Sequence, residues 1–144
     1  MAKKYQVNFM VRLANRMTAA VLRGNSAPPG TYLLTVHGRK TGKAYTAPVR
    51  LIEHDGKRWL VAPYGVVNWV KNARAAGEVS LYRNKVNETV KLRELGPQES
   101  APILKEYITK ESVVRPYFEV PPEASLEEFA AVAPRHPVFL LGAK

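Results

Sequence analysis

The strongest constraint on the fold is a two-residue turn, Asp55-Gly56, that separates two segments rich in β-branched and aromatic residues. These segments are Thr46–Glu53 and Arg58–Ala62. Glycine adopts a positive φ at little cost, and Asp-Gly is typical of the tight turns that join antiparallel strands. The sequence therefore predicts an antiparallel β-hairpin over this part of the chain.

Further short strands and helices are expected on both sides of this hairpin. A second hairpin turns at Asn84-Lys85. The other expected strands are Tyr32–His37, Glu78–Arg83, Val86–Leu95 and Val138–Leu141. The expected helices are Asn68–Ala76 with Gly77 as its C-cap, Pro97–Thr109 with proline in its first turn, and one opened by the capping box Ser125-Leu-Glu-Glu128. This pattern indicates a mainly β (α+β) protein with a small antiparallel barrel, and not a doubly wound parallel sheet.

Length and composition bound the number of domains. With 144 residues, 46% of them hydrophobic, the chain has the size and apolar content of one domain with a real core. No internal repeat or low-complexity tract divides it. We expect an amphipathic helix within residues 1–25, over about Asn8–Arg23, as part of the same domain, and a single domain over residues 26–144.

Cysteine is absent from the chain, which excludes disulfides, thiolate metal sites and a cysteine nucleophile and fits a reducing compartment. No apolar run after the N-terminus is long enough to act as a signal sequence or to cross a bilayer, so we expect a soluble, cytoplasmic protein. His37, His54 and His136 have no metal-ligand spacing, and no metal site is expected. The segment Arg135-His136-Pro137 is interpreted as a connection.

The chain is strongly basic. Its 22 Lys and Arg residues against 12 Asp and Glu residues give a formal net charge of +10, which attracts an anionic partner. Nucleic acid, an acidic lipid surface and a phosphorylated small molecule all fit this charge. The position of the cations within the sequence is more informative than their sum.

The segment His37-Gly38-Arg39-Lys40-Thr41-Gly42-Lys43 has the residues of an anion-binding turn. It places two glycines, one hydroxyl and three cations directly after an apolar strand. Glycine lets backbone N–H groups approach an anion closely, threonine adds a donor, and Arg and Lys neutralise charge. The segment lacks the spacing of a Walker motif, and a solvated basic turn is an equally good interpretation of these residues alone.

A second segment leads from the end of a strand into a short helix. Within Ala62–Asn72, Trp69 and Asn72 stand three residues apart and therefore lie on one face of that helix. There the indole could pack on a flat ring, while the amide bonds the edge of the ring or holds a loop. The alternative is that Trp69 belongs to the core and that Asn72 only stands near the end of the helix.

Together these segments resemble the deazaflavin-dependent nitroreductase and quinone reductase family. The residues that carry the resemblance are Gly38-Arg39-Lys40-Thr41-Gly42, Pro48, Ala62–Gly65 and Trp69-Val-Lys-Asn72. Members of this family use coenzyme F-420, an 8-hydroxy-5-deazaflavin, and share a split β-barrel related to FMN-binding and pyridoxamine-phosphate-oxidase-like folds. The resemblance implies a split barrel of about six antiparallel strands with flanking helices, and an oxidoreductase that uses this coenzyme.

The resemblance also implies site residues. The phosphate and acidic tail of the coenzyme would be held by the basic turn with Arg39, Lys40, Thr41 and Gly42. The deazaflavin ring would lie along the backbone of Ala62, Pro63, Tyr64 and Gly65. The following helix would complete the pocket with Asn68, Trp69 and Asn72. Tyr45, Tyr64 and Gly65 depart from the family's pattern, which often has a further cation at the first position and small or basic residues at the other two.

A substrate that accepts a hydride develops negative charge, which a nearby donor must stabilise or protonate. Tyr117 stands roughly where similar proteins place tyrosines over the substrate pocket, and it is the candidate catalytic residue. Tyr107 is a second candidate. Both rings could instead fill space under the C-terminal helix. The expected small-molecule acceptor is a quinone, a nitro compound or an activated alkene such as an unsaturated lactone.

Alternative functions stay open at this point. An FMN-binding split-barrel reductase fits because FMN also has a phosphate and a flat ring, and a carrier that only sequesters the coenzyme would have the same motif. A nucleic-acid-binding barrel would use the mixed aromatic and cationic residues Tyr45, Arg50, Trp59 and Tyr82. No recognised nucleic-acid motif is present, so no specific nucleic-acid partner is expected.

The role of the N-terminal helix has two interpretations. The N-terminal helix is interpreted as a lid on the substrate pocket, and peripheral contact with the inner face of the plasma membrane is the alternative. A homodimer is compatible with barrels of this kind.

Overall fold

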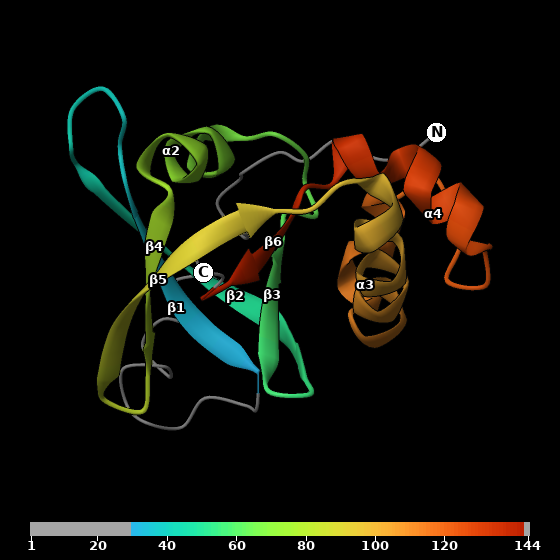
Figure 1. Cartoon of the computed structure of the whole chain (residues 1–144), viewed down its shortest axis with the longest axis horizontal. Coiled ribbons are helices and arrows are strands. Elements are labelled where there is room, and N and C mark those ends of the chain that lie inside the picture. The colour runs from blue at the N-terminus through green and yellow to red at the C-terminus, as the bar shows by residue number, and fades with distance from the viewer. Residues whose placement is uncertain (1–29, 143–144) are drawn as a thin grey trace.

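The computed structural model describes residues 30–142, and in it six strands form a closed antiparallel barrel in the order β1-β2-β3-β6-β5-β4 (Figure 1). The strands are β1 Thr31–His37, β2 Ala44–His54, β3 Lys57–Val61, β4 Glu78–Arg83, β5 Val86–Glu94 and β6 Val138–Leu141. The helices are α2 Asn68–Ala76, α3 Pro97–Lys110, α4 Leu126–Val132 and the 3-10 helices η1 Ser112–Tyr117 and η2 Ala133–Arg135. The predicted mainly β fold and its six strands are confirmed. The expected N-terminal helix lies outside the described residues, and the division of the chain at residue 25 stays a prediction.

The backbone angles explain both predicted hairpin turns. Asp55 and Gly56 have φ angles of 54° and 73°, and Asn84 and Lys85 have φ angles of 50° and 66°. Positive φ at both central residues is what a type I′ turn requires, and the twist of this turn matches the twist of the flanking strands. Lys85 adopts this conformation at a cost of about 1–2 kcal/mol, because its β-carbon crowds the following carbonyl oxygen.

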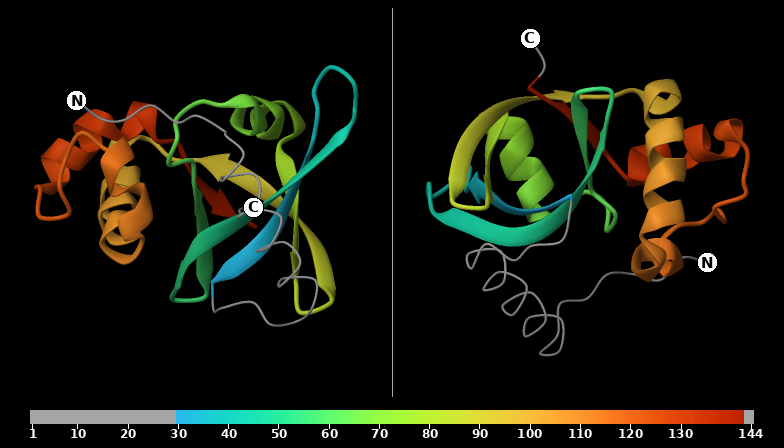
Figure 2. Two further views of the ribbon diagram at one scale, coloured as in Figure 1. Left: turned by 180° about the vertical axis from the view of Figure 1, so that it is seen from behind. Right: turned by 90° about the horizontal axis from the view of Figure 1, so that it is seen from below.

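Two hydrophobic cores lie on the two faces of the sheet. Alternation along the strands sends Leu60 and Phe139 into the barrel, and it sends their neighbours Trp59 and Val138 toward the helices. Helix α2 lies across one end of the ring of strands (Figure 2) and closes it with buried side chains such as Val70. Helices α3 and α4 form a separate layer beside the barrel (Figure 2). Within residues 30–142, no helix has both the length and the hydropathy that crossing a membrane requires.

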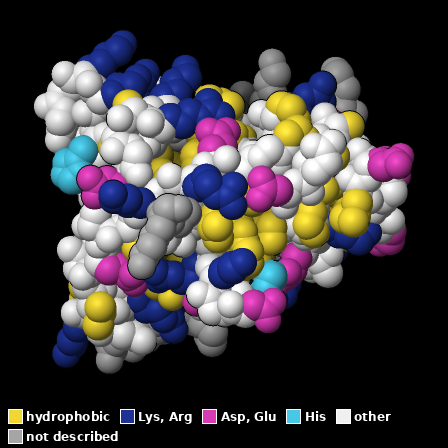
Figure 3. All heavy atoms as spheres, in the orientation of Figure 1, with side chains coloured by type: hydrophobic (Ala, Val, Ile, Leu, Met, Phe, Trp, Pro, Cys, Tyr) yellow, Lys and Arg dark blue, Asp and Glu magenta, His cyan; other side chains and the backbone are white. Residues whose placement is uncertain are grey.

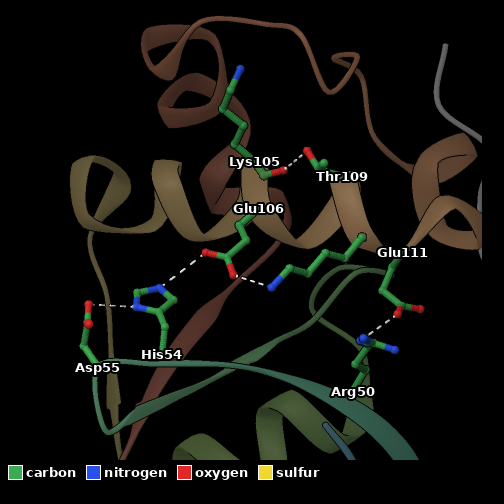
Figure 4. Close-up of polar contacts among 8 residues, drawn as sticks. Arg50, His54, Asp55, Lys105, Glu106, Thr109 and Glu111 are labelled. Atoms are coloured by element: carbon green, nitrogen blue, oxygen red, sulfur yellow. Dashed lines mark hydrogen bonds and ion pairs between the residues drawn. The ribbon is translucent and has the colours of Figure 1, made fainter. Parts of the chain in front are cut away.

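Polar contacts attach this helical layer to β2 (Figure 4). Arg50 Nε lies 2.9 Å from Glu111 Oε1, and His54 Nε2 lies 3.3 Å from Glu106 Oε1. The second oxygen of Glu106 accepts a hydrogen bond from Lys110 Nζ at 2.8 Å. These contacts run along α3 and fix its orientation on the barrel.

The other end of the barrel is closed by charged side chains. Arg58 on β3 donates two hydrogen bonds of 2.9 and 2.8 Å to the carboxylate of Glu88 on β5. The guanidinium carbons of Arg58 and Arg83 each lie 5.8 Å from the centre of the Tyr32 ring. The hydrogen bond from Arg58 lowers the pKa of Glu88 and keeps its carboxylate charged. The Arg58–Glu88 pair thus links two strands that do not pair directly.

We expect Arg58→Met to lower the free energy of unfolding by about 1–3 kcal/mol, because the half-buried Glu88 loses a bidentate charged partner. Arg93→Met is the matched control, since Arg93 and Glu99 form a longer pair of 3.4 Å with side chains about half exposed. Such exposed pairs contribute less than about 1 kcal/mol. Urea denaturation followed by circular dichroism measures both variants. Equal losses would contradict a special role for the Arg58–Glu88 pair.

Candidate functional site

The connection between β1 and β2 is a tight loop at the α2 end of the barrel. The Gly38 N–H donates to Lys43 O at 2.8 Å, the Gly42 N–H donates to Gly38 O at 2.9 Å, and the Lys43 N–H donates to Thr41 Oγ1 at 3.2 Å. Gly42 has a φ of 75°. A β-carbon on Gly38 would lie 3.3 Å from the Tyr45 ring. The backbone therefore favours glycine at position 42, and a side chain at position 38 would crowd the Tyr45 ring. Residues 38–43 are called the basic loop below.

Asn72 holds the basic loop from α2. Its side chain is buried, and its Oδ1 accepts hydrogen bonds from the Arg39 backbone N–H at 3.1 Å and from Arg39 Nη1 at 2.7 Å. A carbonyl oxygen has two lone pairs, and both are used here. The side-chain amide of Asn72 therefore holds a loop, which is one of the two roles expected for it from the sequence. Arg39 is therefore fixed at its main chain and at its guanidinium group.

Several cations around this loop are available to an anion. Arg39, Lys40, Lys43 and Lys71 are exposed, and none of them forms an ion pair with another residue of the described range 30–142. Lysine and arginine side chains gather at the upper left of the surface, over the end that holds the basic loop and α2 (Figure 3). Such a concentration of positive charge attracts anions.

Trp69 stands in the first turn of α2. Its ring is partly buried and packs against the core, with its centre 6.4 Å from that of Phe139. The neighbouring Asn68 is exposed at the first position of α2, and the N-cap Val67 provides no side-chain hydrogen bond to the helix. Trp69 thus has a packing role, and only part of its indole remains open to a ligand.

The segment Ala62–Gly65, called the ring segment below, joins β3 to α2. The Gly65 N–H donates to Ala62 O at 3.4 Å, and the φ of Gly65 is 93°. The Tyr64 ring meets the Tyr117 ring edge to face, with 4.8 Å between the ring centres. The structure therefore brings Tyr117, from the end of η1, against the ring segment.

Tyr107 has a different environment. Its side chain belongs to the core beneath the helices and is 5% exposed. Burial raises the pKa of Tyr107 far above its usual range, and the nearby Glu111 and Tyr64 add to this shift. The space-filling interpretation therefore holds for Tyr107, which is a poor proton donor.

The sequence pattern places His136 in a simple connection, but the structure gives it defined partners. Its ring is 3% exposed, with Nδ1 3.0 Å from Pro63 O and Nε2 3.3 Å from Glu119 Oε2. The contact follows from strand pairing, because Val61 of β3 stands opposite Val138 of β6. A residue just before β6 then lies beside residues just after β3. Only knowledge of this non-local pairing could have indicated the role of His136.

Two of the four residues considered for a nucleic-acid surface have other roles in the fold. Trp59 is buried under α3, and Arg50 is paired with Glu111 (Figure 4). Trp59 therefore has no face on which a base could stack. Within the described part of the chain, no group of three His, Cys, Asp or Glu side chains is arranged to hold a metal ion.

We expect Asn72→Ala to release the basic loop. Loss of a buried acceptor of two hydrogen bonds costs about 1–3 kcal/mol, so the Arg39 amide should exchange with solvent at least about fivefold faster. Asn87→Ala, at an exposed position on β5, is the matched control and should leave the exchange of Arg39 unchanged. Hydrogen exchange measured by NMR tests both variants. An unchanged Arg39 amide in Asn72→Ala would show that the loop is held by its own backbone alone.

Comparison with known proteins supplies the family. A family model described as F420H(2)-dependent quinone reductase matches residues 7–118. A solved structure of an F420-H2-dependent reductase (FDR-A) is 21% identical, with 78% of this chain and 94% of that chain covered and a TM-score of 0.54. No curated protein matches the sequence.

Two other solved structures share the fold at lower identity. One, described as a domain-swapped dimer, is 18% identical over 92% of this chain and 98% of that chain, with a TM-score of 0.56. A candidate pyridoxamine 5′-phosphate oxidase from Listeria innocua is 10% identical over 88% and 90%, with a TM-score of 0.53. These similarities show a split β-barrel. Because the family model covers most of the sequence, the chain belongs to the F420H(2)-dependent quinone reductase family of oxidoreductases.

Proposed function

We propose that this enzyme transfers a hydride from reduced coenzyme F-420 to a quinone, a nitro compound or an activated alkene such as an unsaturated lactone. Family membership supports the coenzyme and the reductase activity. The observation that carries the proposal is the basic loop, in which buried Asn72 fixes Arg39 among exposed cations. The ring segment lies at the same end of the barrel.

The donors of the basic loop fit the phosphate and the acidic tail of the coenzyme. Arg39 and Lys40 supply charge-assisted hydrogen bonds. The Thr41 oxygen accepts the Lys43 N–H, which leaves the hydroxyl proton of Thr41 for a phosphate oxygen. The turn at Gly42 has no β-carbon that would keep an anion away from the backbone. These residues therefore fit an extended anion better than they fit a neutral ligand.

The ring segment would bind the flat part of the coenzyme. Ala62 is buried, while Pro63, Tyr64 and Gly65 are partly exposed and offer backbone and an aromatic ring to a planar group. When bound, the coenzyme supplies the hydride, so that the chain's own residues need only to orient the partners and exclude water. Tyr64 and the exposed part of Trp69 fit this task.

Tyr117 is the proposed proton donor. A hydride delivers two electrons and one proton to the acceptor, and a second proton must neutralise the oxygen on which negative charge develops. Tyr117 is half-buried against Tyr64 and comes from a different segment than the ring segment. This contact supports a role for Tyr117 beside an acceptor that would stack on the coenzyme.

The alternative cofactor, the oligomeric state and the location complete the proposal. FMN is the alternative cofactor, because it would also present a phosphate to the basic loop. The similarity of the fold to that of a candidate pyridoxamine 5′-phosphate oxidase is a further reason to test FMN as a competitor of coenzyme F-420. A homodimer is supported by similarity to the domain-swapped dimer. A cytoplasmic location, and the N-terminal helix as a lid or as a contact with the plasma membrane, stay predictions.

The first test is titration of the protein with coenzyme F-420, with FMN as competitor. We expect Arg39→Ala combined with Lys40→Ala to weaken coenzyme binding by about tenfold to 100-fold, because charge-assisted hydrogen bonds to the phosphate are lost. Lys57→Ala combined with Lys85→Ala is the matched control, since it removes the same charge from turns at the other end of the barrel. Similar losses in both double variants would mean non-specific attraction. If the Arg39→Ala, Lys40→Ala variant binds the coenzyme as tightly as wild type, the basic loop is not part of the coenzyme site.

The second test addresses the proton. We expect Tyr117→Phe to lower kcat for menadione reduction by about tenfold or more, with little change in the dissociation constant of the coenzyme. Tyr107→Phe, in the core, is the matched control and should retain kcat. Stopped-flow measurement of coenzyme oxidation follows the step directly, and repeating it with a nitro compound and an unsaturated lactone ranks the acceptors. An unchanged kcat in Tyr117→Phe would exclude it as the donor.

A further inference from the structure

The segment Arg135–Pro137 lies along the ring segment, contacts it through two hydrogen bonds and approaches Gly65 closely. The Ala62 N–H donates to Pro137 O at 2.8 Å. His136 Nδ1 lies 3.0 Å from Pro63 O. A β-carbon on Gly65 would lie 3.4 Å from the Arg135 carbonyl oxygen. The backbone of the ring segment is therefore fixed by a segment that enters β6 and that lies beyond the region matched by the family model.

His136 is itself held on its face and at both of its nitrogens. Phe118 stacks on the imidazole with 3.8 Å between the ring centres and 13° between the planes. Glu119 Oε2 lies 3.3 Å from Nε2, and Glu119 Oε1 lies 3.2 Å from Arg135 Nη1. Three consecutive residues therefore hold this region together. Tyr117 contacts Tyr64, while Phe118 and Glu119 both contact His136.

When His136 is neutral, only one of its two ring nitrogens carries a proton, so it cannot donate a hydrogen bond to both Pro63 and Glu119. The Pro63 carbonyl can only accept, so the Nδ1 contact requires an Nδ1–H that donates. A neutral imidazole then has a lone pair on Nε2, which faces the charged oxygen of Glu119. Both contacts become favourable when the pair holds one more proton, either on Nε2 or on the carboxyl group of Glu119.

Charge and burial set where this proton resides. The charged groups that face His136 are Glu119 and Arg135. Burial lowers the pKa of His136 and outweighs the opposing effect of Glu119. Burial alone would raise the pKa of Glu119, but hydrogen bonds from its own backbone N–H and from Arg135 lower it, and a proton on His136 Nε2 would lower it further. At neutral pH the imidazole is therefore neutral, with its proton on Nδ1 and donated to Pro63.

We propose that His136 is a positioning residue for the coenzyme site: its Nδ1–H holds the Pro63 carbonyl and thereby fixes the ring segment and the contact of Tyr64 with Tyr117. This inference rests on the proposed function for its effect on the coenzyme. The effect on the ring segment itself is a property of the coenzyme-free protein. Glu119 and Phe118 hold the imidazole in the orientation that this hydrogen bond needs.

Three variants separate this role from simple packing. His136→Phe keeps a ring against Phe118 and removes the bond to Pro63. His136→Asn places an amide N–H near the position of Nδ1 and keeps that bond. Glu119→Gln offers an N–H to Nε2, so that both contacts of a neutral imidazole become favourable without the additional proton. His54→Phe is the control, since His54 is a half-exposed histidine that contacts α3 away from the ring segment.

In the coenzyme-free protein, the readout is the amide spectrum and the hydrogen exchange of Tyr64 and Gly65. We expect His136→Phe to shift both amides and to speed their exchange by at least about fivefold, while His136→Asn and His54→Phe leave them near wild type. In wild type the Tyr64 amide should shift as the pH falls below about 6.5, the ordinary pKa of histidine, because the lowered pKa of His136 moves proton uptake by the pair to more acidic pH. Glu119→Gln should remove most of this pH dependence.

With the coenzyme, we expect His136→Phe to raise the dissociation constant by about tenfold, and His136→Asn and Glu119→Gln to stay within about threefold of wild type. Unchanged Tyr64 and Gly65 amides in His136→Phe would overturn the positioning role. Equal effects of His136→Phe and His136→Asn would overturn it too, because packing would then explain both. Wild-type protein that fails to bind the coenzyme would overturn the proposed function, while the amide spectra would still decide the role of His136.

Discussion

The pairing of β6 with β3 closes the barrel and sets the position of the candidate site. β6 has only four residues, yet it pairs with β3 on one side and with β5 on the other, and so closes the barrel. Phe139 then points into the barrel core and Val138 points into the helical core, and both are almost fully buried. The same pairing sets Arg135–Pro137 beside Ala62–Gly65. Barrel closure and the geometry of the ring segment therefore have one physical origin.

Local sequence signals predicted most of the elements because their causes are local. The positive φ angles at Asp55-Gly56 and Asn84-Lys85 define two hairpins, and Gly77 ends α2 with a φ of 74°. The capping box is present, since Ser125 and Glu128 bond each other's backbone N–H. The 3-10 helices η1 and η2 were not predicted. Both pack against α3, and η2 also packs against α4, so their form depends on this packing as well as on their own residues.

The site was predictable only in part for the same reason. The glycines and cations of the basic loop are visible in sequence, as is the spacing of Trp69 and Asn72. The bond between Asn72 and Arg39 is not visible, because it joins residues that only barrel formation brings together. His136 and Glu119 are further examples, since both gain their partners through the pairing of β6 with β3. Residue type indicated the chemistry, and tertiary contacts decided its orientation.

Net charge alone does not locate the site. Lys57 and Lys85 are exposed in turns at the far end of the barrel, and neither forms an ion pair within residues 30–142. What distinguishes the basic loop is preorganisation: buried Asn72 holds Arg39, so less conformational entropy is lost when an anion binds. The ring segment is preorganised in a similar way by residues next to β6. A ligand that binds both parts selects the closed barrel, and binding must therefore stabilise the fold as well as fill the site.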